Sequence, residues 1–134
     1  MLSGQDITSA VKIGLSKAKS YYEGLPILDD ELRYYSRLFD DNFANLPKNE
    51  IKSSGYLVHT LEAVIWCILN TNDYKSLVLK AVNLCDDTDT VAAIYGAFIG
   101  IIYGLENIPI EWLEVLKKRD YLENICLDFY KILI

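Results

Sequence analysis

Three aspartates and two threonines lie within five consecutive positions, Asp86-Asp87-Thr88-Asp89-Thr90. The segment follows Asn83-Leu84-Cys85 and precedes an apolar stretch without charged residues. Carboxylates this close repel one another unless a cation lies among them, and hard oxygen donors of this kind suit Mg²⁺, Ca²⁺ or Mn²⁺. The pattern alone leaves two interpretations open. One is a divalent-cation site, and the other is a solvated acidic turn that caps the following helix.

A second segment, Ser53 to Ala63, joins a loop rich in serine and glycine to a strongly apolar helix. His59 is the only histidine of the chain, and it is either a packed residue near a helix end or a catalytic base. Tyr56 follows Gly55 at the junction and would either stack on a ligand ring or join the core. Because the chain has ten tyrosines, the core is the favoured interpretation. Glu62 stands as a single acid among apolar residues.

Apolar residues at helical spacing dominate the rest of the chain, and no segment has the two-residue period of a strand. The residues Asp40 to Gly55 break this pattern and indicate a long loop. We therefore expect an all-α protein, a compact bundle of orthogonally packed helices in a single domain, residues 1–134. The expected helices are Ile7–Tyr21, Leu28–Phe39, Leu57–Leu69, Tyr74–Val82, Val91–Leu105, a short one after Pro109, and Tyr121–Ile134.

The expected helix Val91–Leu105 carries small residues at every fourth position, Ala92, Gly96, Gly100 and Gly104. Such a stripe allows another backbone to approach closely. Glycine in a helix costs about 0.5–1 kcal/mol relative to alanine, so close packing must offset that cost. The apolar run is shorter than the ~20 residues that cross a membrane. We predict a buried core helix and no membrane segment.

Composition narrows the possible partners. The formal charge is −6, from 13 basic and 19 acidic residues, which argues against nucleic acid as the main partner. Cys67, Cys85 and Cys126 are widely spaced, so a zinc site is not expected, and we predict buried free thiols in a reducing compartment. The first residues lack the basic and apolar regions of a signal peptide, which favours a cytoplasmic location.

Several segments, in colinear order, resemble the C-terminal half of the ADP-ribosylglycohydrolases, most strongly over residues 53–121. These segments are Ser54–Ala63, Ala81–Leu84, Asp87–Thr90 and Gly96–Gly104, followed by Asn107-Ile108-Pro109 and Trp112-Leu113. Several unlinked motifs in the right order make the resemblance specific, and it covers nearly the whole chain.

The resemblance implies an all-helical fold around two Mg²⁺ ions, with Mn²⁺ as the alternative metal. It implies hydrolysis of the bond between ribose C1 of ADP-ribose and an amino-acid side chain. In the family's Asp-x-Asp-Thr motif both aspartates and the last threonine face the metals, which by position are Asp87, Asp89 and Thr90. The expected partner is ADP-ribose or an ADP-ribosylated protein. Candidate substrate-binding residues are Ser54, Gly55, Tyr56 and His59, and no catalytic residue is assigned.

The chain departs from the family pattern in two ways. Cys85 and Asp86 stand where the family has two glycines, so side chains crowd the expected site. The family's other metal ligands come from a Thr-Asp-Asp-type motif in an N-terminal half, and neither Asp29-Asp30 nor Asp40-Asp41 has that context. Half of a two-metal site cannot hold both ions, so catalysis by this chain alone is not expected.

Three hypotheses follow. The chain is part of a split or truncated enzyme that needs its missing half, or a metal- or ADP-ribose-binding remnant without turnover. The third hypothesis is a helical domain that forms homo-oligomers through apolar surface left bare by the missing half.

Overall fold

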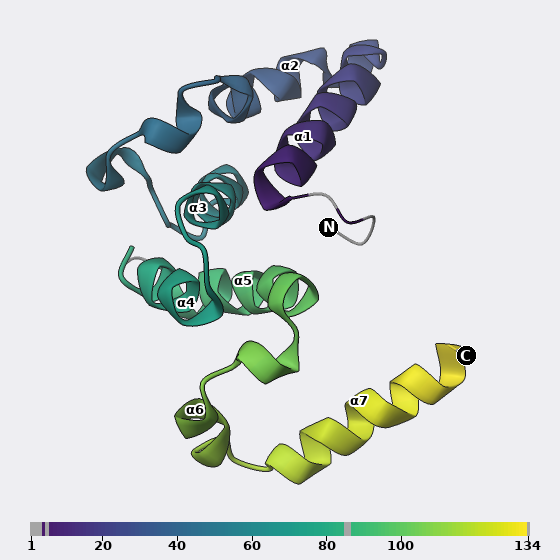
Figure 1. Cartoon of the computed structure of the whole chain (residues 1–134). Helices are drawn as coiled ribbons and strands as arrows, with labels where there is room; N and C mark the ends of the chain where they lie inside the picture. Colours follow the sequence, from purple (N-terminus) through teal and green to yellow (C-terminus); the bar gives the residue numbers. More distant parts are fainter. Residues whose placement is uncertain (1–3, 5, 85–86, 134) are drawn as a thin grey trace.

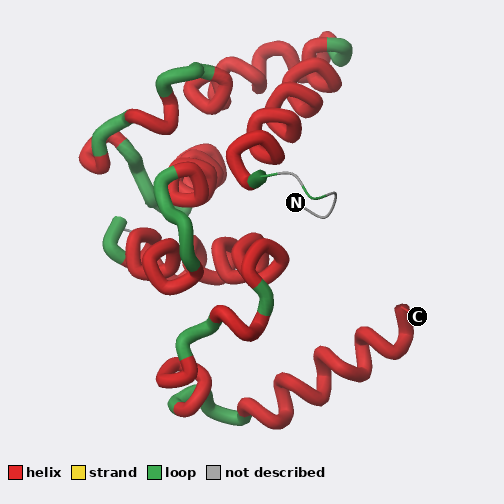
Figure 2. Tube along the Cα trace, in the orientation of Figure 1, coloured by secondary structure: helices red, strands yellow, loops and turns green. Residues whose placement is uncertain are grey.

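The computed structural model describes residues 4, 6–84 and 87–133, and every regular element in these residues is helical. Figure 2 shows helices joined by loops in this part of the chain, without a strand. This confirms the predicted all-α class. The α-helices are α1 (Ile7–Glu23), α2 (Asp29–Leu32), α3 (Leu57–Leu69), α4 (Tyr74–Val82), α5 (Thr88–Tyr103), α6 (Ile110–Glu114) and α7 (Arg119–Leu133). The 3₁₀ helices are η1 (Pro26–Leu28), η2 (Arg33–Phe39), η3 (Phe43–Asn45), η4 (Lys48–Glu50) and η5 (Leu105–Asn107).

Helix α3 is the centre of the molecule, as its apolar sequence predicts. It contacts α1, α4, α5 and η2, and in Figure 1 it lies between the α1–α2 layer and the α4–α5 pair. A helix that packs on several sides has to be apolar nearly all round. Its buried residues include Ala63, Val64 and Cys67, and they pack with Tyr95 and Ile99 of α5.

The predicted second helix differs from the observed one. Helix α2 ends after four residues at Leu32, and the chain continues as the seven-residue 3₁₀ helix η2. In a 3₁₀ helix, side chains three positions apart lie on the same side. Tyr35 and Leu38 have this spacing and both pack on the core. The tighter winding therefore serves tertiary contacts that local propensity does not reveal.

Helix α5 is buried on one side only, which corrects the expectation of a wholly buried helix. Val91, Tyr95 and Ile99 are buried, whereas Phe98 and Ile101 are exposed. The expected close approach along the glycine stripe is wrong for the described residues, because a Cβ on Gly96 or Gly100 would meet nothing within 4 Å. The described chain leaves this face of α5 without a packing partner.

Helix α7 leads away from the rest of the chain in Figure 1. It has no buried residue, and its exposed apolar side chains are Tyr121, Leu122, Ile125, Leu127, Phe129, Tyr130, Ile132 and Leu133. Cys126 on this helix is exposed, which corrects the prediction of buried thiols, while Cys67 in α3 is buried. None of the helices in the described residues is long and apolar enough to cross a membrane.

Candidate functional site

The two segments that carry the candidate site residues, the loop before α3 and the segment around Asp87, lie against each other. The main-chain N–H of Asp87 donates a hydrogen bond to the carbonyl oxygen of Ser53, at 3.0 Å. Gly55, two residues after Ser53, is also close to Asp87: a Cβ atom added to this glycine would lie 3.0 Å from Oδ2 of Asp87. The loop before α3 and the start of α5 therefore lie side by side, although they are far apart in the sequence.

The close approach of the Asp87 carboxylate explains sterically why position 55 is a glycine. A Cβ atom 3.0 Å from an oxygen is closer than side-chain contacts normally allow, so any other residue would displace the carboxylate of Asp87. The backbone of Gly55 is not in the left-handed region. Space, rather than backbone conformation, is what this position requires.

Asp87 occupies the N-cap position of α5, and its carbonyl oxygen accepts a hydrogen bond from the N–H of Val91, at 3.1 Å. Its side chain makes no capping hydrogen bond to the N–H groups of α5 that the structure describes. Asp6 and Asp73, by contrast, cap α1 and α4 through their carboxylates. The capping interpretation of the acidic turn therefore loses support for Asp87.

The carboxylates of Asp87 and Asp89 interact directly. A side-chain hydrogen bond with Asp87, aided by backbone hydrogen bonds at Thr90 and at Asp89 itself, holds the pKa of Asp89 below its usual value. Two carboxylates in contact need a shared proton or a cation between them. Asp89 and Thr90 are both exposed, so the pair is open to an ion from solvent.

The candidate substrate-binding residues cluster where the loop enters α3. Oγ of Ser54 and Nδ1 of His59 are joined by a hydrogen bond of 2.7 Å. The ring of Tyr56 meets the imidazole edge-on, with centroids 5.1 Å apart. The side chain of Tyr56 is half exposed, so its ring remains available to a ligand. His59 thus has two side-chain partners near the start of α3.

The donor set fits part of a magnesium site. Mg²⁺ prefers oxygen ligands, keeps several waters and commonly binds through one or two carboxylates. Asp87 and Asp89 supply two carboxylates, but no group of three or more His, Cys, Asp or Glu residues gathers in the described chain. Cys85 and Asp86, which depart from the family pattern, lie outside the described residues. The described residues thus offer a partial set of ligands.

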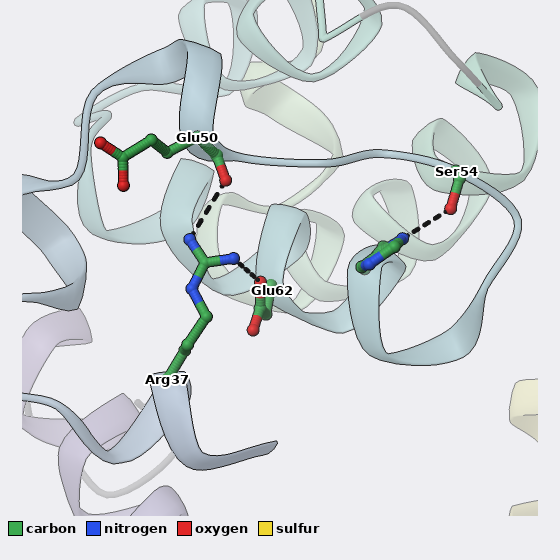
Figure 3. A network of polar contacts seen from close by, with 5 residues as sticks. Arg37, Glu50, Ser54 and Glu62 are labelled. Atoms are coloured by element: carbon green, nitrogen blue, oxygen red, sulfur yellow. Dashed lines mark hydrogen bonds and ion pairs between the residues drawn. The ribbon is translucent and has the colours of Figure 1, made fainter. Parts of the chain in front are cut away.

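Arg37 is a residue of this region that the sequence analysis missed. Its Nη1 donates to Oε2 of Glu62 at 2.9 Å, and its Nη2 donates to the carbonyl oxygen of Glu50 at 3.1 Å (Figure 3). The Glu62 side chain is only 2% exposed. An acid in an apolar helix signals that a cation must pair with it, but nothing in the local sequence says which one.

Comparison with known proteins gives the same family as the residues do. A family model described as ADP-ribosylglycohydrolase matches residues 1–133. An ADP-ribosylarginine hydrolase of Serratia proteamaculans is 44% identical over 79 residues, which are 59% of this chain and 22% of that protein. An ADP-ribosyl-[dinitrogen reductase] glycohydrolase of Rhodospirillum rubrum is 37% identical over 68 residues, 51% of this chain and 23% of that protein. The chain thus spans less than a quarter of the length of these two relatives.

Proposed function

This chain belongs to the ADP-ribosylglycohydrolase family, and on that premise we propose that it supplies one part of a magnesium-dependent site for hydrolysis of ADP-ribosylated proteins. Asp87, Asp89 and Thr90 are the proposed metal ligands. One observation carries the proposal: the Asp87 carboxylate makes no capping bond within the described chain and lies against both Asp89 and Gly55.

The chemistry follows from what such a site does. Asp87, Asp89 and Thr90 would hold Mg²⁺, which would supply Lewis-acid chemistry at the ribose of the substrate. The chain's own residues hold the substrate next to it. The exposed ring of Tyr56, steadied by His59 and Ser54, is placed to stack on a ring of ADP-ribose. Both relatives carry names that specify an ADP-ribosylated target, which supports this substrate class.

We propose that the isolated chain binds metal and ADP-ribose weakly without turnover. Two carboxylates and one hydroxyl give two Mg²⁺ ions few protein ligands, so waters would fill most positions and the ions would be held weakly. The relatives are more than four times as long as the part aligned here, so the remaining ligands would come from polypeptide outside this chain.

Metal titration tests the proposal. We would titrate Mn²⁺ and Mg²⁺ into the chain by calorimetry and compare it with Asp87→Ala/Asp89→Ala. The control is Asp30→Ala/Glu31→Ala, which also removes two neighbouring exposed acids but leaves the site intact. Saturable binding in the wild type and the control, lost in the site variant, is the expected result. No binding at millimolar metal, or equal binding by all three proteins, contradicts the proposal.

Paramagnetic broadening by Mn²⁺ locates the ion. NMR signals of the amides of Gly55, Tyr56 and Asp87 should broaden first, because these residues surround the carboxylate pair. Broadening that begins instead at the acids of α7, Asp120 and Asp128, would show non-specific binding to surface charge.

A second candidate function is association with a further copy of the chain. The exposed apolar faces of α5 and α7 carry this alternative, since monomeric proteins rarely leave large apolar patches bare. The exposed apolar side chains include Phe98 and Ile101 on α5 and Phe129 and Ile132 on α7. The oligomeric state in solution tests this candidate.

A further inference from the structure

The loop from Asp40 to Gly55 is fastened along α3 rather than free in solvent. Side chains of α3 donate hydrogen bonds to its carbonyl oxygens, and the order of the partners shows that the loop runs antiparallel to the helix. The side chains of Asn70, Trp66 and Thr60 donate to the carbonyl oxygens of Ala44, Leu46 and Ser54, at 2.9, 3.0 and 3.1 Å respectively.

Glu62 belongs to the same face of α3 but cannot take part directly. Positions 62, 66 and 70 are four residues apart and so lie above one another on the helix. A carboxylate accepts hydrogen bonds and cannot donate one to a carbonyl oxygen. Arg37 bridges the gap, because its guanidinium donates to Glu62 at 2.9 Å and to the Glu50 carbonyl at 3.1 Å (Figure 3).

The burial of Glu62 explains why this bridge forms. The Glu62 side chain is 2% exposed, and a charge so far from water requires a partner. Arginine suits the position because its planar fork donates in two fixed directions at once. The buried carboxylate thereby aims the second arm of Arg37 at the loop.

The bridge fastens the loop just before it reaches the candidate site. Beyond Glu50 the chain passes through the buried residues Ile51 and Ser53, and the Ser53 carbonyl oxygen accepts the hydrogen bond from the N–H of Asp87. The next residue but one, Gly55, lies against the Asp87 carboxylate. A shift of the loop at Glu50 would therefore be transmitted to the backbone that holds Asp87.

We propose that Arg37 and Glu62 are positioning residues of the site: through the Glu50 carbonyl they set the Ser53–Tyr56 segment against Asp87. The effect on metal binding rests on the proposed function above, whereas the effect on the loop does not. Neither residue touches metal or substrate in this assignment.

The central test is Arg37→Lys, with Arg33→Lys as matched control. Lysine keeps the charge beside Glu62 but lacks the fork that reaches Glu50 at the same time. Arg33 lies on the same 3₁₀ helix, and its exposed side chain contacts neighbours in sequence, Asp30 at 3.8 Å and the Tyr34 hydroxyl at 3.4 Å. The first readout is hydrogen exchange of the Asp87 amide, with the buried Leu77 amide as reporter of global unfolding.

In Arg37→Lys we expect the Asp87 amide to exchange about tenfold faster while Leu77 is unchanged, and Mn²⁺ affinity to fall about tenfold, the lower end of losses caused by residues behind a metal site. Arg33→Lys should match the wild type in both readouts. Wild-type exchange at Asp87 in Arg37→Lys would overturn the proposal.

The two proposals fail separately. If the wild type binds no Mn²⁺, the metal-site proposal fails, and the exchange of the Asp87 amide still decides the role of Arg37. If Arg37→Lys exposes Leu77 as well, Glu62→Leu replaces it, because leucine leaves no buried charge and has no oxygen that could accept the hydrogen bond from Arg37. Faster exchange at Asp87 alone is again the expected result, and unchanged exchange again overturns the positioning role.

Discussion

Gly55 and Asp87 are in contact: a Cβ on the glycine would lie 3.0 Å from Oδ2 of the aspartate. The carboxylate that the family motif assigns to metal binding is therefore packed against the loop that carries the candidate substrate-binding residues. This contact brings two separate sequence motifs together in space.

Substitution Gly55→Ala should impair the site without unfolding the chain. The new methyl group would push the Asp87 carboxylate by a few tenths of an ångström, because the gap is shorter than ordinary contact distances. We expect Mn²⁺ affinity to fall about tenfold, a size typical of displaced metal ligation, with a melting temperature close to that of the wild type. Calorimetric titration and thermal unfolding measure the two effects.

Gly96→Ala is the control for this prediction. A Cβ on Gly96 meets nothing within 4 Å, so the substitution should leave metal affinity unchanged and raise the free energy of unfolding by about 0.5–1 kcal/mol. Equal metal affinity in both alanine variants would argue against the contact between Gly55 and Asp87.

The cap of α4 should make stability depend on pH in the acid range. The backbone N–H of Ser76 donates to Oδ1 of Asp73 at 2.8 Å, and this bond together with a hydrogen bond from the Ser76 side chain holds the pKa of Asp73 below its usual value of 3.8. Because the folded state lowers this pKa, the stabilisation is complete above pH 3.8 and is lost as the pH falls through the folded value. Asp73→Ala should lower the melting temperature at pH 7 and have a smaller effect near pH 2.

Asp73→Asn separates the hydrogen bond from the charge. Asparagine caps helices about as well as aspartate and does not titrate, so its effect on the melting temperature should be small at pH 7. An equal loss of melting temperature in Asp73→Ala at pH 2 and pH 7 would contradict the assignment.

The described cysteines should differ sharply in reactivity. Burial raises the pKa of the Cys67 thiol to about 11, whereas Cys126 is exposed on α7. Thiolates react and thiols do not, so iodoacetamide at pH 8 should label Cys126 in the native protein and Cys67 only after unfolding. Peptide mass spectrometry after timed labelling distinguishes the two sites. Comparable native labelling of both would mean that α3 is not buried as described.

The bare face of α7 should mediate association if the second candidate function is correct. We expect light scattering to show a dimer or larger species for the wild type. Phe129→Asp, which places a charge on a ring that is 63% exposed, should shift the protein to monomer without lowering its helix content. Lys131→Asp changes charge on the same helix and serves as control. A monomeric wild type would refute this candidate.

The sequence by itself determined the helical class, the family and much of the element order. The bounds of α3 and α4 agree with the sequence prediction to the residue. These features depend on periodicity and on hydrogen bonds between residues three or four apart. Such information is local, so it can be read along the chain.

The tertiary structure alone decided which distant residues meet. The pairing of Arg37 with Glu62, the contact of Gly55 with Asp87 and the exposure of Cys126 were not predictable. Periodicity shows that Glu62 faces apolar surroundings, but several cations in the chain have the right charge to pair with it. The choice among them depends on how the loop and η2 pack on α3, because long-range partners are selected by packing geometry and burial rather than by spacing in the sequence.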